Sequence, residues 1–312
     1  MAYTTTSTLD DQVKTAFDQV AYFALRSQPL FEMVADVRST AQSHNGSGVQ
    51  FTFYADMAQA TSALTEATDV TAVALTDSAV TVTLAEYGNA VITTAKVRGT
   101  SFLNVDADAA NIVGYNMADS LDKIVSDVAN GGSNVTHVGQ TSRGAITSSD
   151  VYTAAEGRKA VAQLRTRNAP GWENGNYMAI IHPDVSYDLR GDTAVTDVIQ
   201  YQLYQDGAPI RAGSIGTFNG IEYIENPRAG LIADGGASTV DVYQTLICGR
   251  QALAKAFSRA PGFGPEPSIV VGPVTDTLRR FNPIGWYHLV GYGRFREACL
   301  QRVESASSIG DN

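Results

Sequence analysis

Cysteine is scarce in this chain of 312 residues, and the gaps in its composition exclude several classes of protein. Cys248 and Cys299 are its only cysteines, far apart and outside any Cys-x-x-Cys spacing. This excludes a disulfide framework and a cysteine zinc site, and predicts two buried thiols in a reducing compartment. No apolar run reaches about 18 residues, so no transmembrane helix is predicted. The first residues lack a basic region and an apolar core, so we expect no signal peptide and a soluble, cytoplasmic product.

Motifs for catalysis and cofactor binding are also missing. There is no Gly-Lys dipeptide for a P-loop and no Gly-x-Ser-x-Gly elbow, and the four histidines do not have metal-ligand spacing. The sequence therefore predicts no catalytic residue, no cofactor and no metal. Two alternatives remain: a hydrolase that uses His182 with Asp184 or Asp188, and an adhesin that uses the Arg190-Gly191-Asp192 tripeptide. A histidine bonded to the backbone at a strand end and a plain turn are the simpler readings.

Basic residues are outnumbered by acidic ones. There are 22 Lys+Arg and 32 Asp+Glu, for a net charge of −10, while 44% hydrophobic residues indicate a globular protein. This balance argues against binding of nucleic acid by the whole surface, although it allows a local basic patch. Of the basic residues 17 are Arg and 5 are Lys, which favours fixed, multidentate contacts.

The hydrophobic periodicity predicts an α+β protein with two extended appendages. Residues 106–130 form the clearest helix, with an apolar stripe that includes Val113, Met117 and Leu121, and Gly131-Gly132 ends it. The other expected elements are an amphipathic N-terminal arm over 9–37, strands at 49–55, 80–84, 90–94, 177–181, 240–243, 246–248, 269–271 and 286–290, a hairpin around Asn219-Gly220, helices at 153–167 and after Pro183, a possible short helix at 251–257, and a polar tail from Ser305.

Residues 49–94 are predicted to form a long β-excursion with a loose tip. Between Arg38 and Lys96 the sequence has five acids and no Lys or Arg, whereas Leu278 to Arg302 holds five arginines and one acid, Glu297. We therefore expect one copy's excursion to dock on a neighbour's basic segment, since charge complementarity sets register and partner choice. The alternative is two ordinary solvated faces. The candidate contact residues are Arg279, Arg280, Arg294, Arg296, Asp56, Glu66, Asp69, Asp77 and Glu86.

The order of these parts resembles the major capsid proteins of tailed bacteriophages with the Hong Kong 97-type fold, in particular a podophage and actinobacteriophage subgroup. The similarity covers nearly the whole chain. It rests on the local stretches Leu64-Thr65-Glu66, Glu86-Tyr87-Gly88-Asn89-Ala90-Val91, Ile181-His182-Pro183, Ile215-Gly216-Thr217-Phe218-Asn219-Gly220-Ile221 and Ile284-Gly285-Trp286-Tyr287.

The resemblance implies a division into four parts. They are an N-terminal arm (1–37), an extended β-loop (49–94), a peripheral domain with a long spine helix (38–48, 95–135 and 268–312) and an apical domain (136–267).

The resemblance also implies a structural function without catalysis. Copies would form hexamers and pentamers of an icosahedral shell around double-stranded DNA, inside a virion assembled in the host bacterial cytoplasm. Scaffolding, portal and possibly cement proteins would be its partners, with no membrane. In the type member a loop Lys crosslinks neighbouring subunits; residues 15–95 contain no Lys, so that bond cannot start here. An encapsulin-type compartment is the alternative shell, and the hydrolase and the adhesin come after it.

Overall fold

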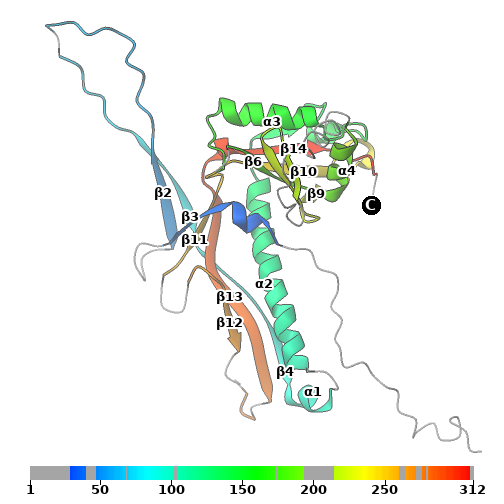
Figure 1. Cartoon of the computed structure of the whole chain (residues 1–312). Coiled ribbons are helices and arrows are strands. Elements are labelled where there is room, and N and C mark those ends of the chain that lie inside the picture. Colours follow the sequence, from blue (N-terminus) through cyan, green and yellow to red (C-terminus); the bar gives the residue numbers. More distant parts are fainter. Residues whose placement is uncertain are drawn as a thin grey trace, which may run out of the picture. The chain divides into compact units, whose positions relative to one another are not determined.

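The computed structural model describes residues 29–39, 47–67, 69–101, 104–172, 175–192, 214–259, 264–271, 276–278 and 280–309. The chain divides into two compact units. Figure 1 labels their helices and strands. The first unit combines residues 88–117 and 269–287, and the second contains the described residues of 27–87, 118–268 and 288–312. The predicted helix over residues 9–28 and the candidate Arg279 lie outside the described residues.

Helices and strands are mixed, as the predicted α+β class requires. The α-helices of the described chain are α1 (Ala95–Thr100), α2 (Val105–Asn130), α3 (Ala154–Thr166) and α4 (Pro183–Gly191). Short 3-10 helices lie at Phe31–Val34, Arg143–Ala145, Ala237–Thr239 and Glu297–Cys299. The strands are β1 (Ala35–Ser39), β2 (Gly48–Tyr54), β3 (Asp77–Thr83), β4 (Ala85–Thr94), β5 (Val135–His137), β6 (Tyr177–Ile181), β7 (Ser214–Phe218), β8 (Ile221–Glu225), β9 (Gly230–Ile232), β10 (Val242–Cys248), β11 (Leu253–Phe257), β12 (Ser268–Val271), β13 (Phe281–Arg294) and β14 (Leu300–Ser305).

Helix α2 confirms the long helix predicted over 106–130. Val113, Leu121 and Val125 are buried along one side, as the apolar stripe requires. Asp106 and Asp108 lie in its first turn, where carboxylates interact favourably with the helix dipole. Its residues up to 117 belong to the first unit and the rest to the second.

A seven-stranded sheet organises the second unit. Its strands follow the order β5-β14-β10-β6-β8-β7, with β9 also paired to β10. Helix α3 packs over one face of this sheet, where Gly157 leaves room for the hydroxyl groups of Tyr223 and Tyr152, and Figure 1 shows α3 above β6 and β14. The Asn219-Gly220 turn joins β7 to β8 with φ angles of 52° and 79°, the left-handed pair of a tight hairpin.

The prediction of a polar tail from Ser305 is wrong, because the C-terminal segment is buried up to Ser307. Strand β14 lies inside the sheet, parallel to β5 and antiparallel to β10, and Ser305 and Ala306 are fully buried. Its polar residues misled the periodicity because several of them, Gln301, Glu304 and Ser307, bond to partners inside the fold rather than to water.

Two further expectations are wrong at the sheet that contains β1, β11 and β13. Residues 253–257 form strand β11 rather than a short helix, because the strand pairs with β1 on one side and β13 on the other and buries both faces. An apolar run without alternation is ambiguous between these two structures. The expected helical arm reaching residue 37 ends instead in a 3-10 turn and the parallel strand β1.

The β-excursion is shorter than predicted. Strands β2 and β3 pair with each other, but β4 pairs with β13 in the other sheet. Thr153, the residue before α3, makes no side-chain cap hydrogen bond. Instead the carboxylate of Asp192 accepts the Ala154 N–H at 3.0 Å, so a residue distant in sequence caps α3.

Replacing Leu121 by Asp tests the packing of α2. Leu121 is 4% exposed, and an unpaired buried charge costs several kcal/mol, comparable with a whole-protein stability of about 5–15 kcal/mol. We expect Leu121→Asp to lose soluble expression. The control Ile112→Asp changes a 48% exposed position of the same helix and should stay soluble. A soluble, folded Leu121→Asp protein would contradict the placement of this stripe.

Candidate assembly interface

The hairpin of β2 and β3 projects a long loop. The two strands pair in antiparallel register from Gly48↔Thr83 to Tyr54↔Asp77. The described residues between them have no helix or strand, and a hydrogen bond from the Ala55 N–H to the Thr76 carbonyl, 2.9 Å, closes the base of the loop. A strand out, a loose tip and a strand back are therefore confirmed, with the return at β3.

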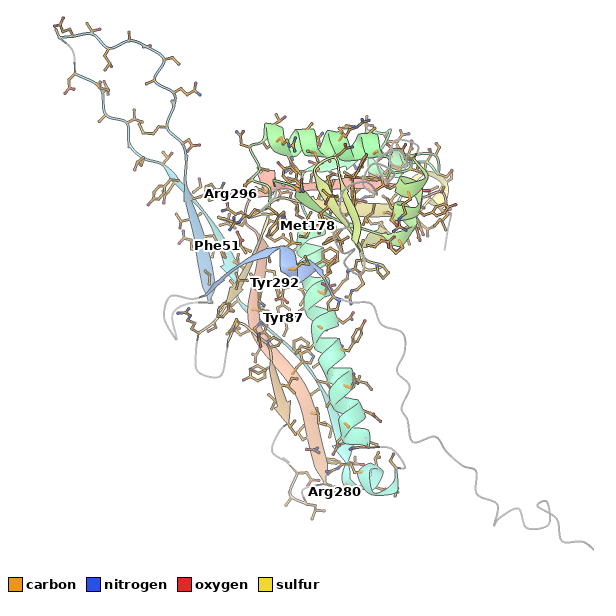
Figure 2. The ribbon with its side chains drawn as sticks, in the orientation of Figure 1. Phe51, Tyr87, Met178, Arg280, Tyr292 and Arg296 are labelled. Atoms are coloured by element: carbon orange, nitrogen blue, oxygen red, sulfur yellow. The ribbon has the colours of Figure 1, made fainter. Side chains whose placement is uncertain are left out.

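A small core of its own fixes the foot of this hairpin. Phe51 is fully buried and its ring centroid lies 5.3 Å from that of Phe295, and Phe53 packs edge-on against Phe295 at 6.0 Å. The Arg296 guanidinium lies 5.5 Å from the Phe53 ring centroid, within cation–π range (Phe51 and Arg296 are labelled in Figure 2). The cluster is completed by Val49, Val82, Ala254 and Ala256.

Glycine in β13 allows the hairpin strands to approach closely. A Cβ added to Gly291 would lie 2.3 Å from the Thr83 carbonyl oxygen, and one on Gly293 would lie 2.8 Å from the Val82 side chain. Both distances are below any normal contact, so a larger residue at either position would push β3 away. The foot of the hairpin is therefore held by shape as well as by apolar area.

The loop itself combines exposed apolar and acidic side chains. Each of its large apolar residues is at least half exposed: Met57 58%, Leu64 78%, Val70 60%, Val73 66% and Leu75 69%. The predicted acids are exposed among or near them, at Asp56, Glu66, Asp69, Asp77 and Glu86. An exposed apolar series of this kind marks an interaction surface.

Two of the predicted arginines pair with carboxylates of their own chain. Arg280 pairs with Asp276 of its own unit, Nε to Oδ2 3.1 Å, and Arg294 pairs with Glu297 at 2.9 Å. Arg302, which the basic segment included, is 7% exposed and bonded to Glu304, so it is not available to a neighbour. Docking through the remaining candidates stays a prediction.

An apolar face that the sequence reasoning missed lies in the first unit. Edge strand β12 exposes Ile269, Val270 and Val271, at 57%, 39% and 65%, and β4 exposes Val91 and Ile92. A groove beside them is lined by Gly88, Asn89, Ala90, Val270, Pro283, Gly285, Trp286 and Tyr287. Three consecutive apolar residues were interpreted as a late strand, but only the sheet order shows that this strand is an edge.

Buried carboxylates are the second feature that the sequence did not reveal. Asp122 of α2 is 2% exposed, and its Oδ1 accepts the N–H groups of Leu30 and Phe31, each at 2.7 Å. Burial raises the pKa of Asp122, against the lowering effect of these two hydrogen bonds. The carboxylate also lies 3.2 Å from Arg228 Nε, and it fixes the chain where the described N-terminal segment meets α2.

Glu304 of β14 forms a denser charged centre and is fully buried. Arg143 holds it with two hydrogen bonds of 2.6 and 2.9 Å, Arg302 lies at 2.9 Å and Gln244 donates at 3.1 Å. Burial would raise the pKa of Glu304, but the bonds from Arg143 and Gln244 and the charge of Arg302 outweigh it, so the pKa lies below its usual value. This network allows charged residues to occupy a central strand.

A third polar cluster surrounds Glu32, which bonds to Lys255 and accepts the Tyr292 hydroxyl at 3.0 Å (Tyr292 is labelled in Figure 2). His288 is 2% exposed, as expected for a core histidine, and its Nε2 has no hydrogen-bond partner among the described atoms. Burial, together with the charge of Lys255, lowers the pKa of His288 to about 4.

The residues of the hydrolase and adhesin alternatives have structural roles. His182 Nδ1 accepts the Asp184 N–H at the start of α4, and Tyr243 donates to Asp184 at 2.7 Å. Burial lowers the pKa of His182. In the tripeptide, Arg190 bonds to Glu225 while Asp192 caps α3.

The described residues hold no group of three His, Cys, Asp or Glu side chains able to bind a metal ion. No helix described in the structure is long and apolar enough to cross a membrane.

Comparison with known families defines the class of protein. Residues 5–309 match the family model described as phage capsid protein, so the chain belongs to this family and is a structural protein of a phage capsid. No curated protein matches the sequence.

Solved capsids share the fold at low sequence identity. The capsid of Ralstonia phage GP4 is 14% identical, with 98% of each chain covered and a TM-score of 0.74. The capsid of cyanophage Pam1 is 13% identical, covering 96% of this chain and 97% of that one, with a TM-score of 0.72. The acid-stable capsid of Helicobacter pylori phage KHP30 is 12% identical over 98% and 99%, with a TM-score of 0.72. The expected Hong Kong 97-type fold is confirmed, and the encapsulin alternative is not favoured.

The lowered pKa of His288 predicts that the folded protein loses stability in acid. Its pKa is about 4 in the folded chain and near 6.5 when unfolded, so only the unfolded chain binds the proton between these values. Stability therefore falls as the pH drops from about 7 to 5, by about 2 kcal/mol from this residue. We expect His288→Leu or His288→Asn to remove that part of the difference between urea unfolding curves at the two pH values. An unchanged difference in both variants would contradict the buried neutral imidazole.

Proposed function

We propose that this protein is the major subunit of an icosahedral shell, built from hexamers and pentamers, that encloses double-stranded DNA. The observation that carries the proposal is the β2–β3 loop, which has apolar side chains that its own chain leaves exposed while its foot is rigidly packed. Such a segment gains its stability from a neighbouring copy.

The β2–β3 loop has a suitable partner surface on a second copy. Strands β12 and β4 expose apolar side chains, and among the described strands β12 lies at the edge of its sheet, where a further chain would pair with its backbone. Apolar residues of the loop would cover that face, and its acids would meet Arg279 and Arg280 of the neighbour. The contact is non-covalent, since no Lys is present between residues 15 and 95.

Under the same proposal the protein belongs to a virion that is assembled in the host cytoplasm, and its partners are scaffolding and portal proteins, with cement proteins as a further option. It assigns no catalytic activity. Its direct test is electron microscopy of the expressed chain, alone and with the scaffolding protein of its phage. Closed shells or hexameric and pentameric rings are expected. A protein that remains a monomer or dimer with the scaffolding protein present would overturn the proposal.

A charged substitution at the loop tip separates assembly from folding. Leu64 and Val73 are 78% and 66% exposed, so Leu64→Asp with Val73→Asp should leave the circular dichroism and urea unfolding of the subunit unchanged. Shells should disappear, because charges then replace the apolar contact. Thr61→Asp, also at an exposed loop position, is the control and should still assemble. Normal shells from the double variant would show that the loop is not an interface.

Charge reversal tests the electrostatic part of the contact. Arg279→Glu with Arg280→Glu should block assembly while the subunit stays folded, since every charged residue of the loop is an acid. Asp276→Asn is the matched control, because it removes the internal pair of Arg280 and keeps both arginines. If the reversed variant formed particles in normal yield, the electrostatic contact would be refuted and only the apolar contact would be left.

A further inference from the structure

Unpaired arginines gather at one place on the second unit. Most arginines whose side chains the structure describes hold a carboxylate of their own chain, as Arg143, Arg190 and Arg228 do. Arg158, Arg165 and Arg250 differ, since their exposed guanidinium groups have no hydrogen bond or ion pair in the described chain. In the described chain, Arg167 and Arg296 also lack a carboxylate partner, but Arg167 donates to Gln301 and Arg296 lies over aromatic rings. In a protein of net charge −10, three exposed arginines with neither kind of partner need a separate explanation.

Helix α3 carries two of these arginines on its outer side. Its inner side, with Gly157, Ala160 and Leu164 among its buried residues, faces the sheet. Arg158 and Arg165 are seven residues apart, so they lie about 10 Å apart along the helix on nearly the same side. The remaining exposed positions on this side are Ala155, Lys159, Ala162 and Thr166.

The C-terminal end of α3 and the residues just beyond it add to this basic face. Arg165 reaches over the turn after β7, where its Nη2 lies 3.1 Å from the position of a Cβ on Gly220. The Arg250 N–H donates to the Pro170 carbonyl at 2.9 Å, which places Arg250 near the C-terminal end of α3. The only carboxylate of the helix, Glu156, pairs with Lys159 at 3.3 Å. The α3 face, defined as Arg158, Arg165 and Arg250, is therefore locally cationic.

We infer that the α3 face binds the phosphate backbone of double-stranded DNA. This inference rests on the proposed function, which supplies enclosed DNA as a ligand. Guanidinium groups bind phosphate through paired N–H donors, and the small alanines between them let a backbone approach the helix closely. Contacts of this kind are independent of base sequence.

The acidic loop of a second copy is the competing occupant, and its chemistry fits less well. That loop exposes large apolar residues such as Leu64 and Val73, which need an apolar partner. The α3 face offers only Ala155, Ala162 and Thr166 between its cations. The apolar side of β12 suits the loop, whereas a uniformly charged, non-apolar chain suits α3.

The test measures binding of full-length, unassembled subunits to a short fluorescein-labelled duplex of arbitrary sequence, by anisotropy over a range of salt concentrations. Weak binding that falls with salt is expected for the unchanged chain. Arg158→Gln with Arg165→Gln and Arg250→Gln should reduce the slope of log K against log salt by up to about 3 and weaken binding by about tenfold or more at low salt. Replacing the same three arginines by Lys should keep the slope.

The control removes equal charge elsewhere, with Lys96→Gln, Lys123→Gln and Arg190→Gln, and should bind as the unchanged chain does. The inference is overturned if the α3 variant binds like this control, if the unchanged chain does not bind the duplex, or if a peptide of residues 55–77 displaces the duplex from the α3 face. Electron microscopy of the same preparations, with the scaffolding protein added, separates the two proposals. Shells without α3-dependent DNA binding refute only this inference, whereas absent shells refute the proposed function.

Discussion

The packing at the foot of the β2–β3 hairpin is the constraint on which the rest of this molecule depends. A loop that keeps its apolar side chains in water cannot stabilise itself, so its direction must be set from below. Phe51, Phe295 and the glycines of β13 do this with close contacts that leave no room for a larger side chain at Gly291. The chain thus separates two tasks: the foot is packed within one subunit, and the loop is left exposed for the contact proposed with another.

Buried charge has a related role in the second unit. Glu304 lies in a central strand, where apolar residues would be the ordinary choice, and it ties Arg143 and Gln244 to β14. Replacing such a network by apolar residues is often neutral for stability, whereas breaking it leaves an unpaired charge that costs about 3–5 kcal/mol. Asp122 acts similarly on the described N-terminal segment, because it accepts two backbone N–H groups that would otherwise lie buried without an acceptor. These carboxylates fix which segments pack together.

Much of the fold could be predicted from local patterns. Helix α2 followed from its apolar period, the β7–β8 turn from Asn219-Gly220, and the extended hairpin from the alternation around Phe51. The failures have a common cause, which is that the decisive contact is distant in sequence. Strand β11 pairs with β1 and β13, and β4 pairs with β13 rather than with its neighbour in the chain, which no window of residues can show.

The candidate interface could likewise be predicted only in part. The acidic loop could be predicted because its charges lie together in the sequence. The sequence could not show which arginines of the basic segment are available to a neighbour, since it does not reveal that Arg294 pairs with Glu297 and that Arg302 is buried. The face of β12 was missed because an edge strand and a central strand share one composition. The unpaired arginines of α3 were hidden among ordinary helix surface residues.

The position of β14 also has a consequence in time. Strand β5 pairs with residues 302–304, which the ribosome adds about 165 residues after β5 itself. At typical rates of synthesis the sheet therefore stays open for roughly ten to thirty seconds, with the edges of β5 and β10 unfilled. A nascent chain in that interval lacks the strand that joins them. Fragments that stop before residue 300 would lack the strand that lies between β5 and β10, so only a completed chain can form this sheet.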